Sequence, residues 1–215
     1  MPSAEAGGPP GTGLPVFTPT GEETVHRGWF IRLQRATFLD PDGVPFERHI
    51  VRHPGAVAVV AVTERDTVVL VHQYRPAVDR WLLEIPAGTC DVVDEPSEAT
   101  ARRELAEEVG YAADRLDLLT RTVITPGFCD EYTDIYLASG LSSVPSDRQG
   151  AEERFLSVVE VPLDRFDAMV DDGSIIDAST ILGVGLAVRR LAARPPVARP
   201  VVASSLAARP LVETD

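Results

Sequence analysis

The stretch Gly88–Tyr111, GTCDVVDEPSEATARRELAEEVGY, contains the strongest structural signal in this chain. Pro96 suits the first turn of a helix and Gly110 suits the position just past its end, so three to four helical turns are expected between them. Apolar residues recur every four positions along this segment and predict a stripe that packs on a sheet. They are Ala101, Leu105 and Val109. The stretch therefore predicts a helix that covers one face of a β-sheet.

Three glutamates, Glu104, Glu107 and Glu108, lie at positions i, i+3 and i+4 of this helix and so share one face. Like charges at this spacing destabilise a helix. A hard divalent cation with oxygen ligands would compensate for their repulsion, although an isolated cluster of this kind is usually a solvated acidic surface. Such a cation neutralises phosphates and activates water, which is the chemistry that diphosphate hydrolysis needs.

The octapeptide at 103–110, RELAEEVG, resembles the Nudix box, whose family hydrolyses nucleoside diphosphates linked to another group. The resemblance implies that Glu104, Glu108 and the backbone carbonyl of Ala87 bind the metal. Glu107 has the same ligand type on the same face and is counted with these metal residues. It also implies that Arg103 pairs with an acidic residue of the preceding loop. The spacing from the box glycine, Gly88, is one residue longer than usual, so either Asp94 or Glu95 is a candidate partner.

Four further segments resemble the ADP-ribose pyrophosphatase branch of that family. They are VHQYRP at 71–76, LEIPAG at 83–88, TPGFCDE at 125–131 and DGSIIDAST at 172–180. Pro126 lies 16 positions beyond Gly110, at the place that marks a preference for ADP-ribose in the branch. The resemblance covers roughly residues 25–190 and implies hydrolysis of ADP-ribose to AMP and ribose 5-phosphate.

Substrate-binding residues are expected at the ends of strands. Arg75 and, as a weaker candidate, Arg52 could hold a phosphate, the alternative being surface ion pairs. Glu131 lies on a glycine-containing loop that could close over the site, and its carboxylate would orient or deprotonate the attacking water.

The resemblance also implies contacts to the nucleoside. Glu84 is a candidate for recognising the ribose or adenine region. Trp29, or its neighbour Phe30, is a candidate for stacking on adenine from a sheet that lies across a homodimer, the alternative being packing. The catalytic candidates are Glu131, Glu107 and Arg103, and Pro126 is counted with the substrate-binding residues.

Composition limits the classes of partner. The chain has 215 residues, a formal net charge of −13 and a pI near 4.7, which argues against nucleic acid or an anionic membrane surface. Its two cysteines, Cys90 and Cys129, lack a disulfide or zinc spacing and favour a reducing, cytoplasmic setting. The sequence shows no signal peptide pattern and no apolar run near the roughly 20 residues of a membrane span.

Strand and helix patterns alternate between two Pro- and Ala-rich ends. Strands are expected at 29–38, 46–52, 56–62, 67–74, 81–85, 121–125, 133–138 and 154–161, and further helices at 163–171 and 178–192. We expect a disordered tail at 1–15, an N-terminal β-sheet region at 16–55, a Nudix domain at 56–193 and a flexible tail at 194–215. The predicted fold is an α/β/α sandwich with a mixed sheet, plus an N-terminal antiparallel sheet involved in dimerisation.

The predicted function is hydrolysis of the ADP-ribose diphosphate by a homodimer, with two or more Mg²⁺ ions per site and Mn²⁺ as the other candidate metal. A first alternative is the same reaction on another nucleoside diphosphate sugar, such as GDP-mannose. A second alternative is a Nudix-like sensor that binds ADP-ribose without cleaving it. Such sensors usually carry a DNA-binding helical domain and a degraded box, which this acidic chain with its intact box does not display.

Overall fold

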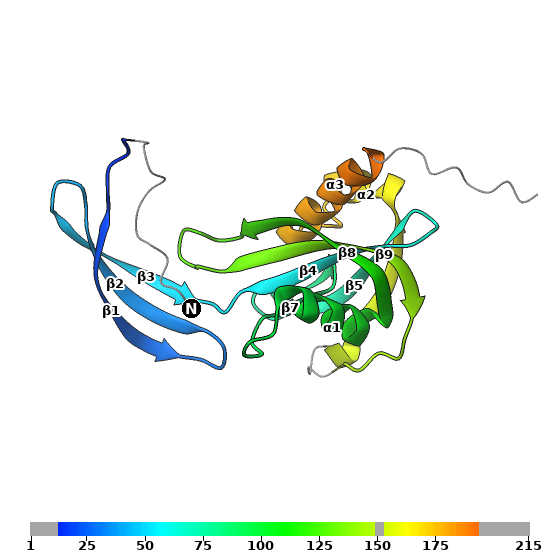
Figure 1. The fold of residues 1–215 in the computed structure, drawn as a ribbon, viewed down its shortest axis with the longest axis horizontal. Coiled ribbons are helices and arrows are strands. Elements are labelled where there is room, and N and C mark those ends of the chain that lie inside the picture. Colours follow the sequence, from blue (N-terminus) through cyan, green and yellow to red (C-terminus); the bar gives the residue numbers. More distant parts are fainter. Residues whose placement is uncertain (1–12, 149–152, 194–215) are drawn as a thin grey trace, which may run out of the picture.

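The computed structural model describes residues 13–148 and 153–193, which form two sheets and three α-helices (Figure 1). The three-stranded sheet contains β1 (Thr18–Arg27), β2 (Arg32–Leu39) and β3 (Pro45–Arg52). The seven-stranded sheet contains β4 (Ala56–Val62), β5 (Thr67–Arg75), β6 (Arg80–Glu84), β7 (Ala87–Thr89), β8 (Tyr111–Val123), β9 (Tyr132–Ser143) and β10 (Ser157–Pro162). The helices are α1 (Ser97–Val109), α2 (Phe166–Asp171) and α3 (Ala178–Ala192), and short 3-10 turns lie at Glu153–Phe155 and Leu163–Arg165.

The continuous apolar run of β4 places this strand at the centre of the larger sheet, between β5 and β9. It runs parallel to β9 and antiparallel to β5, so the sheet is mixed. Because side chains alternate along a strand, Val57 and Val59 pack toward α1, whereas Ala58 and Val60 pack toward α2 and α3. Helices thus cover both faces (Figure 1), and the predicted α/β/α sandwich is confirmed.

Helix α1 lies where the sequence predicts it. Pro96 precedes it, and Gly110 ends it in the left-handed conformation, with φ of 70°, while its N–H donates to the Ala106 carbonyl at 3.0 Å. Its apolar stripe is buried as expected, since Ala101 and Leu105 are fully covered. The glutamates flank this stripe on one side, and Glu108 is buried beside it.

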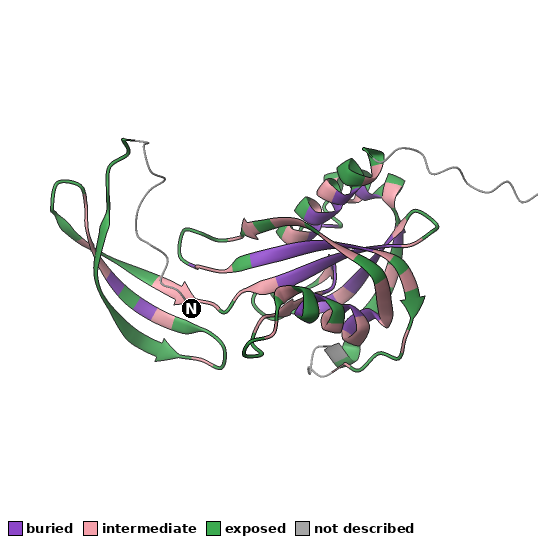
Figure 2. Ribbon diagram, in the orientation of Figure 1, coloured by how far each residue is buried: buried purple, intermediate pink, exposed green. Residues whose placement is uncertain are grey.

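The three-stranded sheet stands beside the larger domain and buries little of itself (Figure 2). Among the residues of β1, β2 and β3, all of which are described, only Gln34 and Ala36 are buried. The link to the larger sheet, 53–55, includes Gly55 at φ of 103°, where a Cβ would meet the Tyr132 carbonyl at 3.3 Å. A sheet this poorly covered is marginal as an isolated unit.

Most predicted elements are found near their expected bounds, and the differences have physical reasons. Strand β1 was missed because every one of its residues is exposed, so no alternation marks it. The strand expected from Trp29 begins at Arg32, after a bend at 29–30. Strand β8 begins at Tyr111, directly after α1, ten residues before the predicted start. The predicted tail at 194–215, and most of that at 1–15, lies outside the described residues.

No helix within the described residues is long and apolar enough to cross a membrane.

Candidate active site

Strand β7 and the glutamate face of α1 meet at two contacts. The Ala87 N–H donates to the Glu108 carboxylate at 3.0 Å. The Glu104 carboxylate lies directly beside Gly88, where a Cβ would come within 2.1 Å of its carboxyl carbon. Strand β7 is held in turn by pairing with β4. The absence of a side chain at Gly88 therefore lets a carboxylate of α1 approach this strand.

Arg103 connects the loop to the glutamates. It donates to Glu95 at 3.3 Å, to Glu104 at 2.7 Å and to Glu107 at 3.0 Å. Burial alone would lower the pKa of Arg103, but its bond to Glu95 and the charges of the other two glutamates outweigh burial and raise it. Of the two candidates, Glu95 is thus the acidic partner of Arg103. Asp94 lies in the left-handed conformation, with φ of 62°, in the loop that is one residue longer than usual.

The residues present fit a divalent cation by donor type and charge. Carboxylate oxygens are the hard ligands that Mg²⁺ prefers, and Glu104, Glu107 and Glu108 lie on one helix face. In the described parts of the chain no three acidic, histidine or cysteine side chains are already gathered as a metal-binding group. Instead the Arg103 guanidinium contacts two of these carboxylates, so a bound cation would compete with it for them.

A cavity of about 450 Å³ opens beside strand β7, at the ends of β5 and β6. Three of the predicted substrate and catalytic side chains line it together with Ala87 and Gly88: Arg75, Glu84 and Glu131. Glu84 is buried, and its carboxylate accepts hydrogen bonds from Gln73 at 2.7 Å and from Arg75 at 2.8 Å. Burial would lower the pKa of Arg75, but Glu84 outweighs that effect and raises it. The guanidinium is therefore charged and oriented at the cavity wall.

Asp177 and Ser179, at the start of α3, also line the cavity, although no local pattern in the sequence marks them as site residues. Asp177 caps α3 by accepting hydrogen bonds from the Thr180 N–H and hydroxyl, each at 2.7 Å. The Thr180 hydroxyl oxygen accepts from the Ile85 N–H at 2.9 Å. This chain of bonds ties α3 to the segment that leads into the Ala87 loop. The DGSIIDAST segment was noticed in the sequence, but only the fold places it against residue 85.

Three predicted substrate residues lie outside this cavity. Arg52 and Pro126 line a second cavity of about 470 Å³, between the three-stranded sheet and the loop of residues 124–131. Trp29 is 98% exposed and, with Phe30, lines a third cavity beside the loop of residues 90–95, and Phe30 also lines the first cavity. Their contact with substrate stays a prediction, because the single chain does not bring them to Arg75 and Glu131.

The loop of residues 124–131 is tied to the end of β3. Val51 and Cys129 form a parallel bridge, and Asp130 accepts hydrogen bonds from His53 and Arg52. Glu131 itself accepts from the Thr133 hydroxyl at 3.2 Å and faces the first cavity. The sequence singled out Glu131 in this loop and missed Asp130, because the ties run to a strand about 78 residues earlier in the chain.

Comparison with known proteins agrees with this architecture. The NUDIX domain matches residues 52–178. The chain is 41% identical over 163 residues to the ADP-ribose pyrophosphatase of Bacillus subtilis, covering 76% of this chain and 88% of that protein. It is 38% identical over 168 residues to the ADP-ribose pyrophosphatase of Mycobacterium tuberculosis, covering 78% and 81%.

A crystal structure of an ADP compounds hydrolase matches the fold with a TM-score of 0.71 and 24% identity, over 81% of this chain and 95% of that one. At this identity the match concerns the fold alone. The domain match covers more than half of the chain, and the sequence relatives align over about three quarters of it. With the glutamate helix, its glycine loop and the adjoining cavity in place, the chain belongs to the NUDIX domain family.

Proposed function

We propose that this protein hydrolyses the diphosphate bond of ADP-ribose to AMP and ribose 5-phosphate. The observation that carries the proposal is the meeting of α1 with the Ala87–Gly88 loop, at the edge of a cavity that also contains Arg75 and Glu131. The printed names of the Bacillus and Mycobacterium relatives support ADP-ribose as the substrate.

The metal of the proposed reaction is Mg²⁺, with Mn²⁺ as the other candidate and two or more ions per site. Proteins named as Nudix ADP-ribose pyrophosphatases generally depend on a divalent metal. Glu104, Glu107, Glu108 and the Ala87 carbonyl would hold the ions. When bound, such ions neutralise phosphate charge and make a bound water more acidic. Arg103 would keep the loop and the helix together through Glu95.

Residues that line the cavity would bind the substrate and the attacking water. Arg75, oriented by Glu84, would hold a phosphate, because its guanidinium geometry suits phosphate oxygens. Glu131 would orient the attacking water or accept its proton. Glu84 would contact the ribose or adenine region, and Pro126 would shape the loop beside it. An aromatic side chain of the three-stranded sheet, Trp29 or Phe30, would stack on the adenine.

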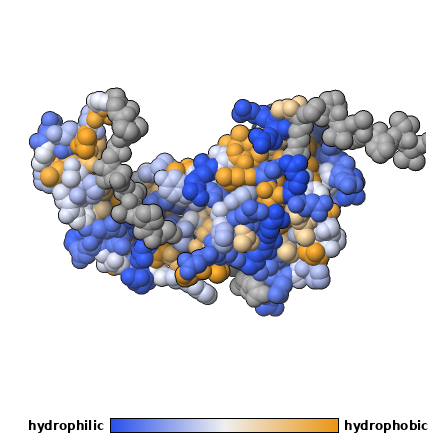
Figure 3. Space-filling view, in the orientation of Figure 1, coloured by the Kyte–Doolittle hydropathy of each residue, from blue (hydrophilic) through white to orange (hydrophobic). Residues whose placement is uncertain are grey.

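We further propose that the protein acts as a homodimer through its three-stranded sheet. This sheet buries only Gln34 and Ala36, yet large apolar side chains are exposed on β1 and at its two ends: Val25, Phe17 and Trp29. Apolar side chains also appear on the surface of this part of the molecule in Figure 3. A second copy would cover such a surface and bring Trp29 to a neighbouring site. Sedimentation equilibrium should give twice the chain mass, and a monomer at micromolar concentration would contradict the proposal.

The domain division and the compartment stay proposals of the same kind. We propose that the catalytic unit comprises residues 56–193 and the sheet region residues 16–55. The described cysteines, Cys90 and Cys129, are both free, which supports a reducing compartment such as the cytoplasm.

The experiment that tests the function measures AMP release from ADP-ribose with Mg²⁺, against an EDTA control and a panel including GDP-mannose. Glu108→Gln should lower kcat at least about a hundredfold, because removing a metal ligand weakens charge stabilisation in the transition state. Glu98→Gln on the same helix is the matched control, since Glu98 pairs only with exposed Arg102 among the contacts described. No release from a folded, metal-loaded protein, or normal turnover by Glu108→Gln, would contradict the proposal.

A further inference from the structure

We propose that Asp130 is a positioning residue that holds Glu131 in its working place by tying the loop of residues 124–131 to the end of β3. The inference rests on the proposed function, in which Glu131 orients or deprotonates the attacking water. It assigns a role to a residue that was not among the candidates from the sequence.

Asp130 uses both carboxylate oxygens and its backbone in this tie. One carboxylate oxygen accepts a hydrogen bond from the His53 backbone N–H at 2.8 Å, and the other accepts one from Arg52 Nη1 at 3.1 Å. The Asp130 N–H donates to the Val51 carbonyl at 3.1 Å, and the Val51 N–H donates to the Phe128 carbonyl at 2.7 Å. The carboxylate contacts thus add two side-chain ties to the two backbone bonds between the loop and β3.

Asp130 and Glu131 face different cavities. Glu131 lines the cavity that holds Arg75 and Glu84, whereas Asp130 lines the one between the loop and the three-stranded sheet. Consecutive residues of extended chain point to opposite sides, which explains the division. Because Asp130 does not line the cavity with the proposed catalytic groups, its effect on hydrolysis would pass through the placement of Glu131.

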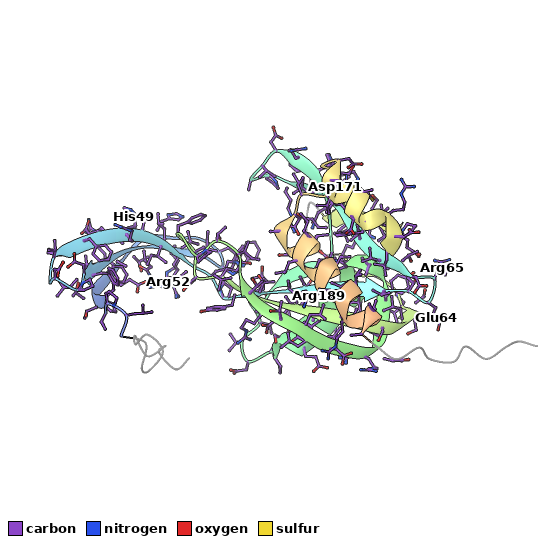
Figure 4. The ribbon with its side chains drawn as sticks, turned by 90° about the horizontal axis from the view of Figure 1, so that it is seen from above. His49, Arg52, Glu64, Arg65, Asp171 and Arg189 are labelled. Carbon is purple, nitrogen blue, oxygen red and sulfur yellow. The ribbon has the colours of Figure 1, made fainter. Side chains whose placement is uncertain are left out.

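Arg52 anchors the tie from the other side. It lies at the end of the three-stranded sheet nearest the larger domain (Figure 4) and donates to both carboxylate oxygens of Glu22 on β1, at 2.9 and 3.0 Å. The bond to Glu22 and, to a lesser degree, that to Asp130 raise the pKa of Arg52, so its charge is permanent. A charged donor held by β1 and β3 therefore fixes the Asp130 carboxylate in place.

The test compares kcat, KM and thermal midpoint for Asp130→Ala, Asp130→Asn and the control Glu23→Ala. A displacement of about 1 Å at a reacting group costs about a hundredfold, so Asp130→Ala should lower kcat about ten- to a hundredfold with little change in KM. Asp130→Asn keeps an acceptor for His53 and should recover part of the loss. Glu23→Ala removes an exposed ion pair of the same sheet, that of Glu23 with Arg35, without touching Arg52 or the loop, and should leave kcat within about twofold.

A double-mutant cycle with Glu131→Gln separates this idea from general damage to the fold. If Asp130 acts through Glu131, Asp130→Ala should change kcat less than about twofold in the Glu131→Gln background. An equal loss in both backgrounds, or an equal loss for Glu23→Ala, would overturn the inference and leave the proposed function standing. Normal kcat for Glu131→Gln would remove the proposed role of Glu131 and this inference together, while the metal-dependent reaction would still be judged by Glu108→Gln.

Discussion

The substitution Gly88→Ala tests the close contact between the Glu104 side chain of α1 and strand β7. The added Cβ would lie 2.1 Å from the carboxyl carbon of Glu104 and 2.2 Å from its Oε1, against an ordinary contact distance of 3.4 Å or more. The carboxylate must therefore retreat by more than 1 Å. It is the far end of a flexible side chain, so the fold can accommodate the change, but a proposed metal ligand cannot stay in place.

A displacement of this size corresponds to a loss of about a hundredfold in kcat/KM, or about 2.7 kcal/mol of transition-state stabilisation. The assay is AMP release from ADP-ribose over a range of Mg²⁺ concentrations, with the thermal midpoint measured in parallel. The midpoint should change little, and more Mg²⁺ should be needed for half-maximal rate.

Gly185→Ala is the matched control, because a Cβ at this exposed position of α3 would meet nothing within 4 Å. It should leave activity unchanged and stabilise the helix by roughly 0.5–1 kcal/mol. Activity within about threefold of the parent for Gly88→Ala would refute the assignment of Glu104 as a metal ligand held beside the loop.

Three further outcomes are expected. Gly183→Ala should lower the free energy of unfolding by about 1–3 kcal/mol in denaturant titrations, because its Cβ would lie 3.0–3.1 Å from three buried side chains; an unchanged value would contradict the packing described. Arg121 lowers the pKa of Asp134 below its usual value of 3.8. The contribution of this pair to stability is therefore complete above about pH 5 and lost as pH falls below about 4. Asp134→Asn should flatten that part of the stability–pH curve, and an identical acid slope would refute the pairing. Arg75→Ala should raise KM for ADP-ribose and lower the free energy of unfolding by about 1–3 kcal/mol, because Glu84 stays buried with fewer donors.

The last substitution has its own control. Arg65 pairs with Glu160 at the far end of the larger domain (Figure 4), with 73% of its side chain exposed. Arg65→Ala should change stability by less than about 1 kcal/mol and leave KM unchanged. An equal rise in KM for both variants would show that Arg75 does not act at the cavity.

Local patterns in the sequence were sufficient for several elements. Helix α1 was predicted from Pro96, Gly110 and an apolar stripe, and β4 was predicted at its observed bounds from an uninterrupted apolar run. Both signals are strong because burial and capping act on neighbouring residues. Strand β1 carries no such signal, since its residues are all exposed and its partners are provided by β2.

Local sequence patterns could not decide whether Asp94 or Glu95 pairs with Arg103. Both acids have suitable chemistry, and only the path of the loop places the Glu95 carboxylate within reach of Arg103. Arg52 is a similar case. Its charge suggested a phosphate contact, but whether it faces a substrate depends on the sheet around it, and in the chain described here it pairs with Glu22 and Asp130.

Residue type and short-range spacing are sufficient to predict the glutamate helix, the sheet that it covers and the chemical character of the site. Which groups converge depends on the three-dimensional fold. The Gln73–Glu84–Arg75 cluster, the link from Asp177 through Thr180 to Ile85, and the tie from Asp130 to Arg52 join segments separated by as many as 95 residues. Such contacts follow from strand order and register, which depend on the packing of the whole core and cannot be read from any short stretch.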